Sequence, residues 1–126
     1  MKPEPVFSSD APMPIGPYSQ AIAIGDLIFL SGQIALDPQT GAMTGSTVEE
    51  QTRRIFKNIR AVISARSLSL ASLVKTTAFL TDMGSFGAFN KVYEEELNGW
   101  KPARSVVEVS GLPKNALVEI EAVACR

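Results

Sequence analysis

Residues 101–110 read KPARSVVEVS, and residues 117–125 read LVEIEAVAC. Both segments are short and rich in β-branched residues, and Pro, Gly, Lys and Asn bound them, so the pattern predicts two β-strands. The loop between them contains Gly111 and Pro113, which both disfavour regular secondary structure. We therefore expect the C-terminal part of the chain to lie in a sheet.

Charged side chains interrupt the two predicted strands. Because side chains alternate between the faces of a strand, Arg104, Val106 and Glu108 share one face of the first strand. In the second strand, Glu119 and Glu121 lie opposite a fully apolar face. That apolar face holds Val118, Ile120, Ala122 and Ala124. A guanidinium and a carboxylate on adjacent strands form either a structural ion pair or a binding site, and the strand pattern alone favours the ion pair.

The composition is that of an ordinary globular domain, and we expect one domain over residues 1–126. The 12 basic and 13 acidic residues balance and form no basic run, so no nucleic-acid partner is expected. No apolar run is long enough to span a bilayer, and the first ten residues contain no signal-peptide core. These features favour a cytoplasmic protein without membrane contact.

The chain contains no histidine and a single cysteine. The absence of histidine removes the commonest general base and the usual zinc ligands. One cysteine excludes an intramolecular disulfide framework. We therefore expect no metal and no cofactor, and any catalysis must depend on carboxylates, Tyr, Lys, Arg, hydroxyls or backbone groups.

The N-terminal part of the chain predicts a loop followed by a hairpin. Residues 14–20 read PIGPYSQ, and two prolines around a glycine predict a rigid loop that presents Tyr18. Packing of Tyr18 into a gap is an equally good interpretation. Residues 21–24 and 27–30 are apolar runs separated by Gly-Asp, which predicts a hairpin in which Gly25 takes a positive φ.

A helix is predicted after this hairpin. Two overlapping capping boxes, Ser46/Glu49 and Thr47/Glu50, precede apolar residues at helical spacing. The amphipathic pattern extends to about Arg66.

A strand and a second helix follow. Residues 73–80 read LVKTTAFL and predict a strand. Asp82 or Ser85 can cap the second helix. Its apolar stripe comprises Phe86, Phe89, Tyr93 and Leu97. Residues 94–96 are three glutamates at its C-terminal end, where the helix dipole disfavours negative charge.

The order of elements predicts an α+β fold with both helices on one face of a mixed sheet. Two helices leave the other sheet face uncovered. Leu117, Val123 and Cys125 make that face partly apolar, so we expect it to be covered by self-association.

Six segments, spread over nearly the whole chain, resemble the RidA (YjgF) family and occur in that family's order. They are Ile15–Gln20, Ser31–Ile34, Val74–Thr77, Pro102–Ser105, Leu112–Lys114 and Val118–Ala122. The combination is specific, whereas any one segment is weak. The resemblance implies a chorismate-mutase-like fold and a homotrimer with sites in the clefts between subunits. It also implies hydrolytic deamination of reactive 2-imino or enamine acids, such as 2-aminoacrylate, to 2-keto acids and ammonia.

The resemblance also implies roles for particular residues. Arg104 matches the arginine that holds the substrate carboxylate, and Glu119 matches the acidic residue that places and activates water. Pocket-lining positions fall at Tyr18, Ser31, Gly32 and Asn90. Gly32 leaves a predicted strand, where a glycine either marks a bulge or lets a ligand approach closely.

One position departs from the family pattern. Val106 stands where well-known members have a cysteine, so thiol-dependent behaviour is not expected, and Cys125 should be dispensable. Two other functions stay open. One is a non-catalytic trimer that binds small carboxylates and regulates a partner. The other is an RNA-cleaving translation inhibitor, which would need a basic, aromatic-lined surface.

Overall fold

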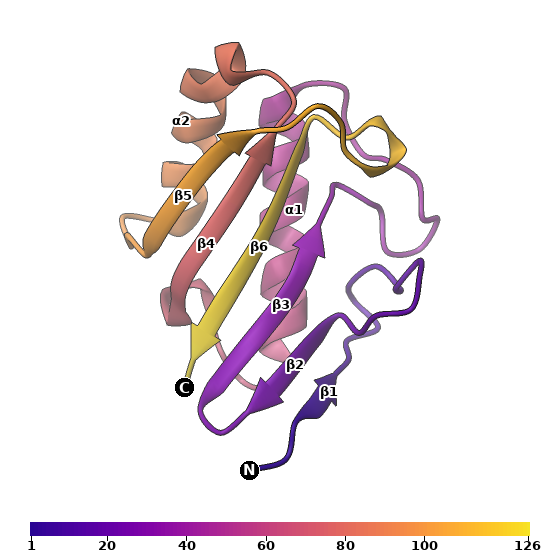
Figure 1. Cartoon of the computed structure of the whole chain (residues 1–126), viewed down its shortest axis with the longest axis vertical. Helices are drawn as coiled ribbons and strands as arrows, with labels where there is room; N and C mark the ends of the chain where they lie inside the picture. The colour runs from indigo at the N-terminus through magenta and orange to yellow at the C-terminus, as the bar shows by residue number, and fades with distance from the viewer.

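The computed structural model describes all residues, Met1–Arg126, as six strands and two helices (Figure 1). The strands are β1 (Glu4–Val6), β2 (Ala21–Ile24), β3 (Leu27–Gln33), β4 (Leu73–Leu80), β5 (Ala103–Glu108) and β6 (Val118–Cys125). The helices are α1 (Val48–Ser64) and α2 (Phe86–Leu97), and short 3₁₀ turns lie at η1 (Leu70–Ser72), η2 (Met83–Ser85) and η3 (Pro113–Asn115).

The six strands form one sheet in the order β1-β2-β3-β6-β4-β5. Only β4 and β5 are parallel, joined through the crossover helix α2, and the other pairs are antiparallel. Figure 1 shows both helices on the far side of the sheet and no helix across its near face. The predicted α+β fold, with two helices on one face of a mixed sheet, is therefore confirmed.

Two details of the sheet differ from expectation. The strands that carry Arg104 and Glu119 are not adjacent, because β4 lies between β5 and β6. The interpretation of Arg104 and Glu119 as an ion pair within one chain is therefore wrong. Residues 4–6 form a strand where a loop was expected, and Pro5 is tolerated there because β1 is an edge strand.

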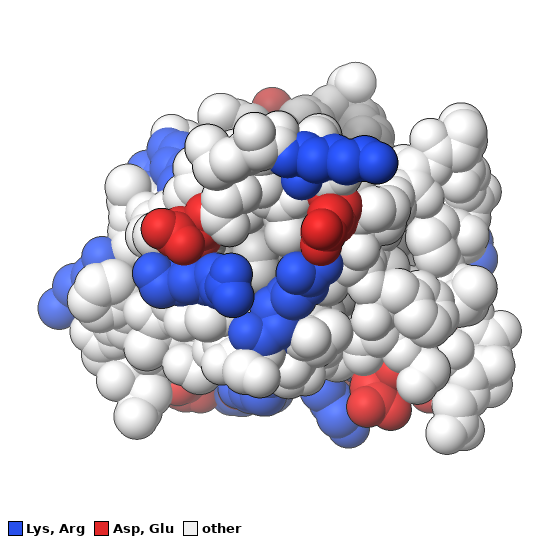
Figure 2. Space-filling view, turned by 90° about the horizontal axis from the view of Figure 1, so that it is seen from below, with Lys and Arg blue, Asp and Glu red and all other residues white.

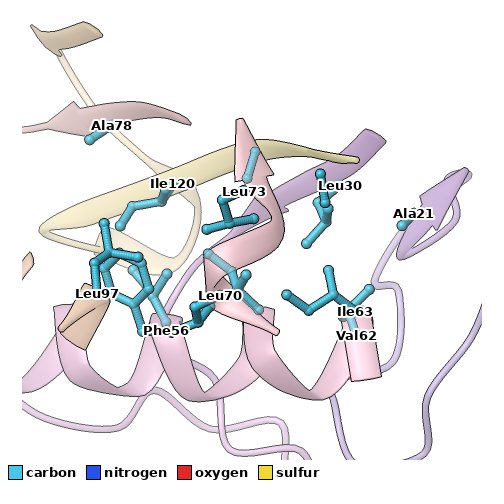
Figure 3. Close-up of a cluster of buried hydrophobic side chains, with 14 of the residues drawn as sticks. Ala21, Leu30, Phe56, Val62, Ile63, Leu70, Leu73, Ala78, Leu97 and Ile120 are labelled. Atoms are coloured by element: carbon cyan, nitrogen blue, oxygen red, sulfur yellow. The ribbon is translucent and has the colours of Figure 1, made fainter. Parts of the chain in front are cut away.

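The core lies between the sheet and α1. Figure 3 shows Phe56, Val62 and Ile63 of α1 pointing toward strand residues that include Leu30 and Ile120. The exposed fraction of Phe56, Val62 and Ile63 is 0%, so the predicted apolar stripe of α1 is buried as expected.

The caps explain where the helices begin and end. The Thr47/Glu50 box forms: the Glu50 amide donates to Thr47 Oγ1 at 3.1 Å, and the Thr47 amide donates to Glu50 Oε1 at 3.3 Å. Ser85 is the N-cap residue of α2, although its side chain makes no capping bond. Helix α2 ends at Leu97 because Asn98 adopts left-handed backbone angles.

Two of the three glutamates at the end of α2 pair with α1. Glu95 lies 2.6 Å from Arg53, and Glu96 lies 3.3 Å from Arg53 and 3.9 Å from Arg60. These pairs are exposed, so each contributes little to stability. They offset the unfavourable placement of acidic groups at this helix end.

The near face of the sheet is partly apolar. The exposed fractions of Phe29 and Val107 are 45% and 41%, and Leu27 is 38% exposed. The partly apolar surface that was expected on β6 therefore also includes residues of β3 and β5.

Replacing Thr47 by alanine should lower the free energy of unfolding by about 1 kcal/mol, because it removes the acceptor of the Glu50 amide. Ser46→Ala is the matched control and should lower it less, since Ser46 contributes its backbone amide. Urea unfolding at one fixed protein concentration measures both changes. Equal losses would show that the Ser46/Glu49 box competes in solution.

Candidate functional site

Arg104 lies on the helix-covered side of the sheet, at the edge strand. In the parallel β4–β5 register, Arg104 is the partner of Thr76, a buried residue of that face. The guanidinium Nη1 donates to Asn90 Oδ1 at 2.7 Å. Its Cζ atom lies 4.7 Å from the centroid of the Tyr93 ring and 5.7 Å from that of Phe86. Two aromatic rings and one amide therefore hold the guanidinium.

No carboxylate lies within ion-pair distance of Arg104, and the four ion pairs of the chain all involve other residues. The guanidinium lines a pocket of about 290 Å³. The lining residues are Asn90, Tyr93, Glu94, Gly99, Trp100, Lys101, Pro102 and Arg104. A partly buried guanidinium without a counter-ion is suited to binding a carboxylate in bidentate geometry.

Hydrogen bonds tie the segments before and after α2 to strands β5 and β4. Glu108 Oε1 accepts a hydrogen bond from the Met83 amide at 2.7 Å, which links the end of β5 to the turn before α2. The indole of Trp100 donates to the Leu73 carbonyl at 2.8 Å. These contacts fix the helix that presents Asn90 to Arg104.

Glu119 lies on the other face of the sheet. It lines a smaller cavity of about 50 Å³ together with Tyr18 and Gly32. The β3–β6 pairing is irregular between Leu30 and Gln33, so Gly32 lies in a bulge. A Cβ added at Gly32 would lie 2.9 Å from Cδ of Glu119. The Glu119 carboxylate therefore occupies the space that a side chain at position 32 would need. The prediction of a bulge at Gly32 is therefore confirmed, and the atoms that approach Gly32 closely are those of the Glu119 side chain. Close approach of a ligand to Gly32 stays a prediction.

The electrostatics of Glu119 differ from those of an ordinary surface carboxylate. Burial raises the pKa of Glu119 above its ordinary value, and the neighbouring charge of Glu121 raises the pKa further. A carboxylate with a raised pKa is a stronger base than an exposed one.

The Tyr18 loop is held by side chains that the sequence patterns did not single out. The buried side chain of Gln20 donates to the carbonyls of Ser8 and Pro12, both at 3.0 Å, and accepts from the Ser8 amide at 2.7 Å. Ser31 Oγ donates to the Ser19 carbonyl at 2.6 Å. Ser31 thus supports the loop that carries Tyr18, whose ring is half exposed.

Five of the six predicted site residues form two groups in one chain, and Ser31 lines neither of these pockets. Arg104 and Asn90 line the first pocket, and Tyr18, Gly32 and Glu119 line the second. Gln20, Tyr93 and Phe86 were missed as contributors. The signal for Gln20 was its place in the PIGPYSQ segment, whereas nothing in the spacing of α2 distinguished Tyr93 from the other apolar-stripe residues.

A metal centre needs a cluster of ligands, a membrane span needs a long apolar helix, and a nucleic-acid interface needs a basic patch. No group of three or more His, Cys, Asp or Glu residues is placed to hold a metal ion. None of the helices has the length and apolar content that crossing a membrane requires. Basic and acidic side chains are interspersed on the face shown in Figure 2, which carries no continuous basic patch.

The fold is that of the RutC and Rid proteins. The chain belongs to the family described as Endoribonuclease L-PSP, which matches residues 8–126. A RutC family protein of Pyrococcus abyssi is 48% identical over 98% of both chains. Reactive Intermediate Deaminase A of Arabidopsis thaliana, a chloroplastic protein, is 41% identical over 98% of this chain and 66% of its own.

One solved relative of the chain contains a bound amino acid. The crystal structure of Escherichia coli TdcF with bound serine is similar to this chain with a TM-score of 0.91 and 39% identity, covering 98% of both chains. The predicted family resemblance is confirmed by these matches.

Gly32→Ala should displace the Glu119 carboxylate toward solvent, because a Cβ would overlap it. The pKa of Glu119 should then fall toward its ordinary value, as NMR titration of the glutamate carboxyl carbons would show. Gly111→Ala is the control, since nothing lies within 4 Å of a Cβ there. A raised pKa that survives in Gly32→Ala would mean that the carboxylate keeps its place.

Proposed function

We propose that this protein hydrolyses reactive 2-imino and enamine acids to 2-keto acids and ammonia. The observation that carries the proposal is the partly buried guanidinium of Arg104, which two aromatic rings and Asn90 hold without a counter-ion. Membership of the family and the similarity to a reactive intermediate deaminase support this reaction. The serine bound to the relative TdcF supports a small carboxylate ligand.

The proposed chemistry starts with substrate binding. The fork of Arg104 binds the substrate carboxylate in one plane, and this fixes the position of the adjacent C=N carbon. Asn90 stabilises the orientation of the fork. Tyr18, Ser31 and Gly32 contribute the wall of the site around the imine.

Glu119 then supports the addition of water. The substrate reacts as its protonated imine: the water oxygen bonds to the C=N carbon, Glu119 accepts a proton of that water, and the C=N π electrons move to the nitrogen. Glu119 gives this proton to the nitrogen of the resulting amino alcohol. The C–N bond then breaks with loss of ammonia, and Glu119 accepts the hydroxyl proton as the C=O bond of the keto acid forms. The raised pKa of Glu119 suits a group that accepts and returns a proton.

This chemistry requires two subunits. Arg104 and Glu119 line different pockets on opposite sides of the sheet of one chain, and β4 lies between their strands. A homotrimer in which Arg104 of one chain meets Glu119 of the next completes each site. The partly apolar near face of the sheet is a suitable surface for such an assembly.

Two alternatives use other features. A small-carboxylate-binding regulator would keep Arg104 and its pocket but show no turnover. An RNA-cleaving protein is suggested by the family description, although the net charge of −1 disfavours RNA binding.

The direct test generates 2-aminoacrylate in situ with a serine dehydratase and follows the appearance of pyruvate and ammonia with and without the protein. Acceleration above the spontaneous rate is expected. Binding of a 2-keto acid without acceleration would favour the regulator.

Glu119→Gln should lower kcat by roughly 10²–10⁴-fold, because an amide cannot accept the proton of water. Affinity for a keto acid through Arg104 should survive. Glu121→Gln is the control on the same strand face and should leave the rate mostly intact. A parent-like kcat in Glu119→Gln would remove Glu119 from the mechanism.

The same variant should differ from the parent in pH-dependent stability. Folding raises the pKa of Glu119, so ionisation of this group opposes folding. The penalty is absent below the ordinary pKa and grows as pH rises through the raised value. Glu119→Gln should therefore melt at a higher temperature than the parent at neutral pH, and at the same temperature well below pH 4.5.

Mixing two impaired variants should restore activity. Arg104→Lys keeps the charge but loses the planar fork, so carboxylate affinity should fall roughly ten- to hundredfold. Trimers are then refolded from equal amounts of Arg104→Lys and Glu119→Gln chains. With random assembly, roughly a quarter of the shared sites contain both parent residues, Arg104 from one chain and Glu119 from the next. The deaminase rate of the mixture should rise to about that fraction of the parent rate.

The control mixes the two variants as preassembled proteins without refolding, and no gain is expected. A stable monomer in light scattering, or no gain after refolding, would contradict the shared site.

A further inference from the structure

Thr76 and Tyr93 form the one hydrogen bond between two buried side chains in this protein. Thr76 Oγ1 and the Tyr93 hydroxyl lie 2.7 Å apart, and the exposed fractions of the two residues are 0% and 6%. The other buried side-chain hydrogen bonds go to backbone carbonyls: Gln20 to the N-terminal loop, Thr52 to its own helix, and Asn58 to the Leu36 carbonyl. In those bonds a side chain donates to a backbone carbonyl, whereas the Thr76–Tyr93 bond joins two side chains.

The pair lies directly beneath Arg104. The Tyr93 ring is 4.7 Å from the guanidinium carbon, and Thr76 is the strand partner of Arg104 in the β4–β5 register. Tyr93 comes from α2 and Thr76 from β4, so their bond connects the helix that carries Asn90 to the strand beside Arg104.

The surroundings fix the plane of the Tyr93 ring. Phe56 packs edge-on against it at 5.4 Å and 74°, and Phe89 lies at 5.5 Å and 48°. The hydroxyl bond to Thr76 removes the remaining freedom of the ring to tilt. A cation–π contact depends on the cation lying over the ring face, so the orientation of the ring sets where the guanidinium is most stable.

We propose that Tyr93, oriented by its hydrogen bond to Thr76, is a positioning residue that holds the Arg104 guanidinium in the plane in which it receives a carboxylate. Asn90 fixes one edge of the guanidinium and the Tyr93 ring fixes its face. The proposal rests on the proposed function only in taking a 2-keto or 2-imino carboxylate as the ligand of Arg104.

Core packing alone does not explain the pair. Phenylalanine and valine have nearly the same shapes as tyrosine and threonine, and would fill the same space between α2 and β4 without a buried hydroxyl. Burial also raises the pKa of Tyr93, although the Thr76 hydrogen bond and the charge of Arg104 oppose the rise. The phenol therefore stays neutral at working pH and leaves Arg104 free of a counter-ion.

The test compares variants in two measurements: affinity for 2-oxobutanoate by titration calorimetry, and kcat and KM for the in situ imine. Tyr93→Leu removes the ring and should weaken 2-oxobutanoate binding roughly five- to thirtyfold. Tyr93→Phe and Thr76→Val should each weaken it by a smaller, similar factor, and the double variant should be no weaker than either single variant. KM should rise in every case, while kcat at saturating substrate is retained.

Leu97→Ala is the matched control. Leu97 is buried in the same helix, but it is not one of the aromatic residues around Tyr93 and makes no cation–π contact with Arg104. This variant should lower the melting temperature about as much as Tyr93→Leu and leave 2-oxobutanoate affinity at the parent value.

Each result decides the proposal. Parent-like affinity in Tyr93→Leu, or equal losses of affinity in Tyr93→Leu and Leu97→Ala, would show that Tyr93 only packs the core. Nearly isosteric Tyr93→Phe and Thr76→Val answer the same question if the leucine variant does not fold. Loss of 2-oxobutanoate binding in the Tyr93 variants would support the positioning role even if the parent showed no deaminase activity. A parent that hydrolyses the imine but whose Tyr93 variants keep their KM would overturn the positioning role and leave the proposed function intact.

Discussion

The packing of β6 against the helices is the interaction on which the rest of the structure depends. β6 pairs with both β3 and β4, and its alternate residues Val118, Ile120, Ala122 and Ala124 are buried. Burial of these side chains is favourable by roughly 25 cal/mol per Å² of apolar surface. Because side chains alternate along a strand, the same burial places Glu119 and Glu121 on the open face. A register slip of one residue would bury two carboxylates and expose four apolar side chains, so the position of Glu119 over Gly32 is fixed by the core.

Strand β4 relates the two half-sites to each other. Thr76 of β4 pairs with Arg104, and Phe79 of β4 pairs with Glu119. Thr76 lies on the helix-covered face and Phe79 on the open face, so the alternation along one strand keeps the cation and the carboxylate apart. The two groups therefore cannot pair within a chain. Within one chain the guanidinium has no ion-pair partner and the pKa of the Glu119 carboxylate is raised, as the proposed function requires.

Much of this architecture could be predicted from the sequence, because periodicity and turn chemistry are local. The hairpin turn forms with Gly25 at φ 57°, and α1 begins at one of the two expected capping boxes. Strand order is not local, and two strands joined by a short loop were expected to be neighbours. The chain instead crosses from β5 over β4 to β6, since the crossover through α2 makes β4 and β5 parallel partners. The family resemblance predicted which residues form the site. The hydrogen bonds by which Gln20 holds the Tyr18 loop and Tyr93 bonds to Thr76 are tertiary contacts, and the spacing of residues in the sequence does not predict them.

The buried polar groups show where this fold departs from the simplest stable core. A buried hydroxyl or carboxylate is less favourable than an apolar group of the same shape unless its hydrogen bonds are complete. Gln20 and Ser31 satisfy loop carbonyls around Tyr18, Thr76 and Tyr93 satisfy each other under Arg104, and Glu119 remains half-buried without a basic partner. Tyr93, Gln20 and Glu119 each line one of the two pockets. A sequence selected for stability alone would replace several of these polar groups by apolar residues, so their presence fits the proposed role of holding one cation and one carboxylate in fixed orientations.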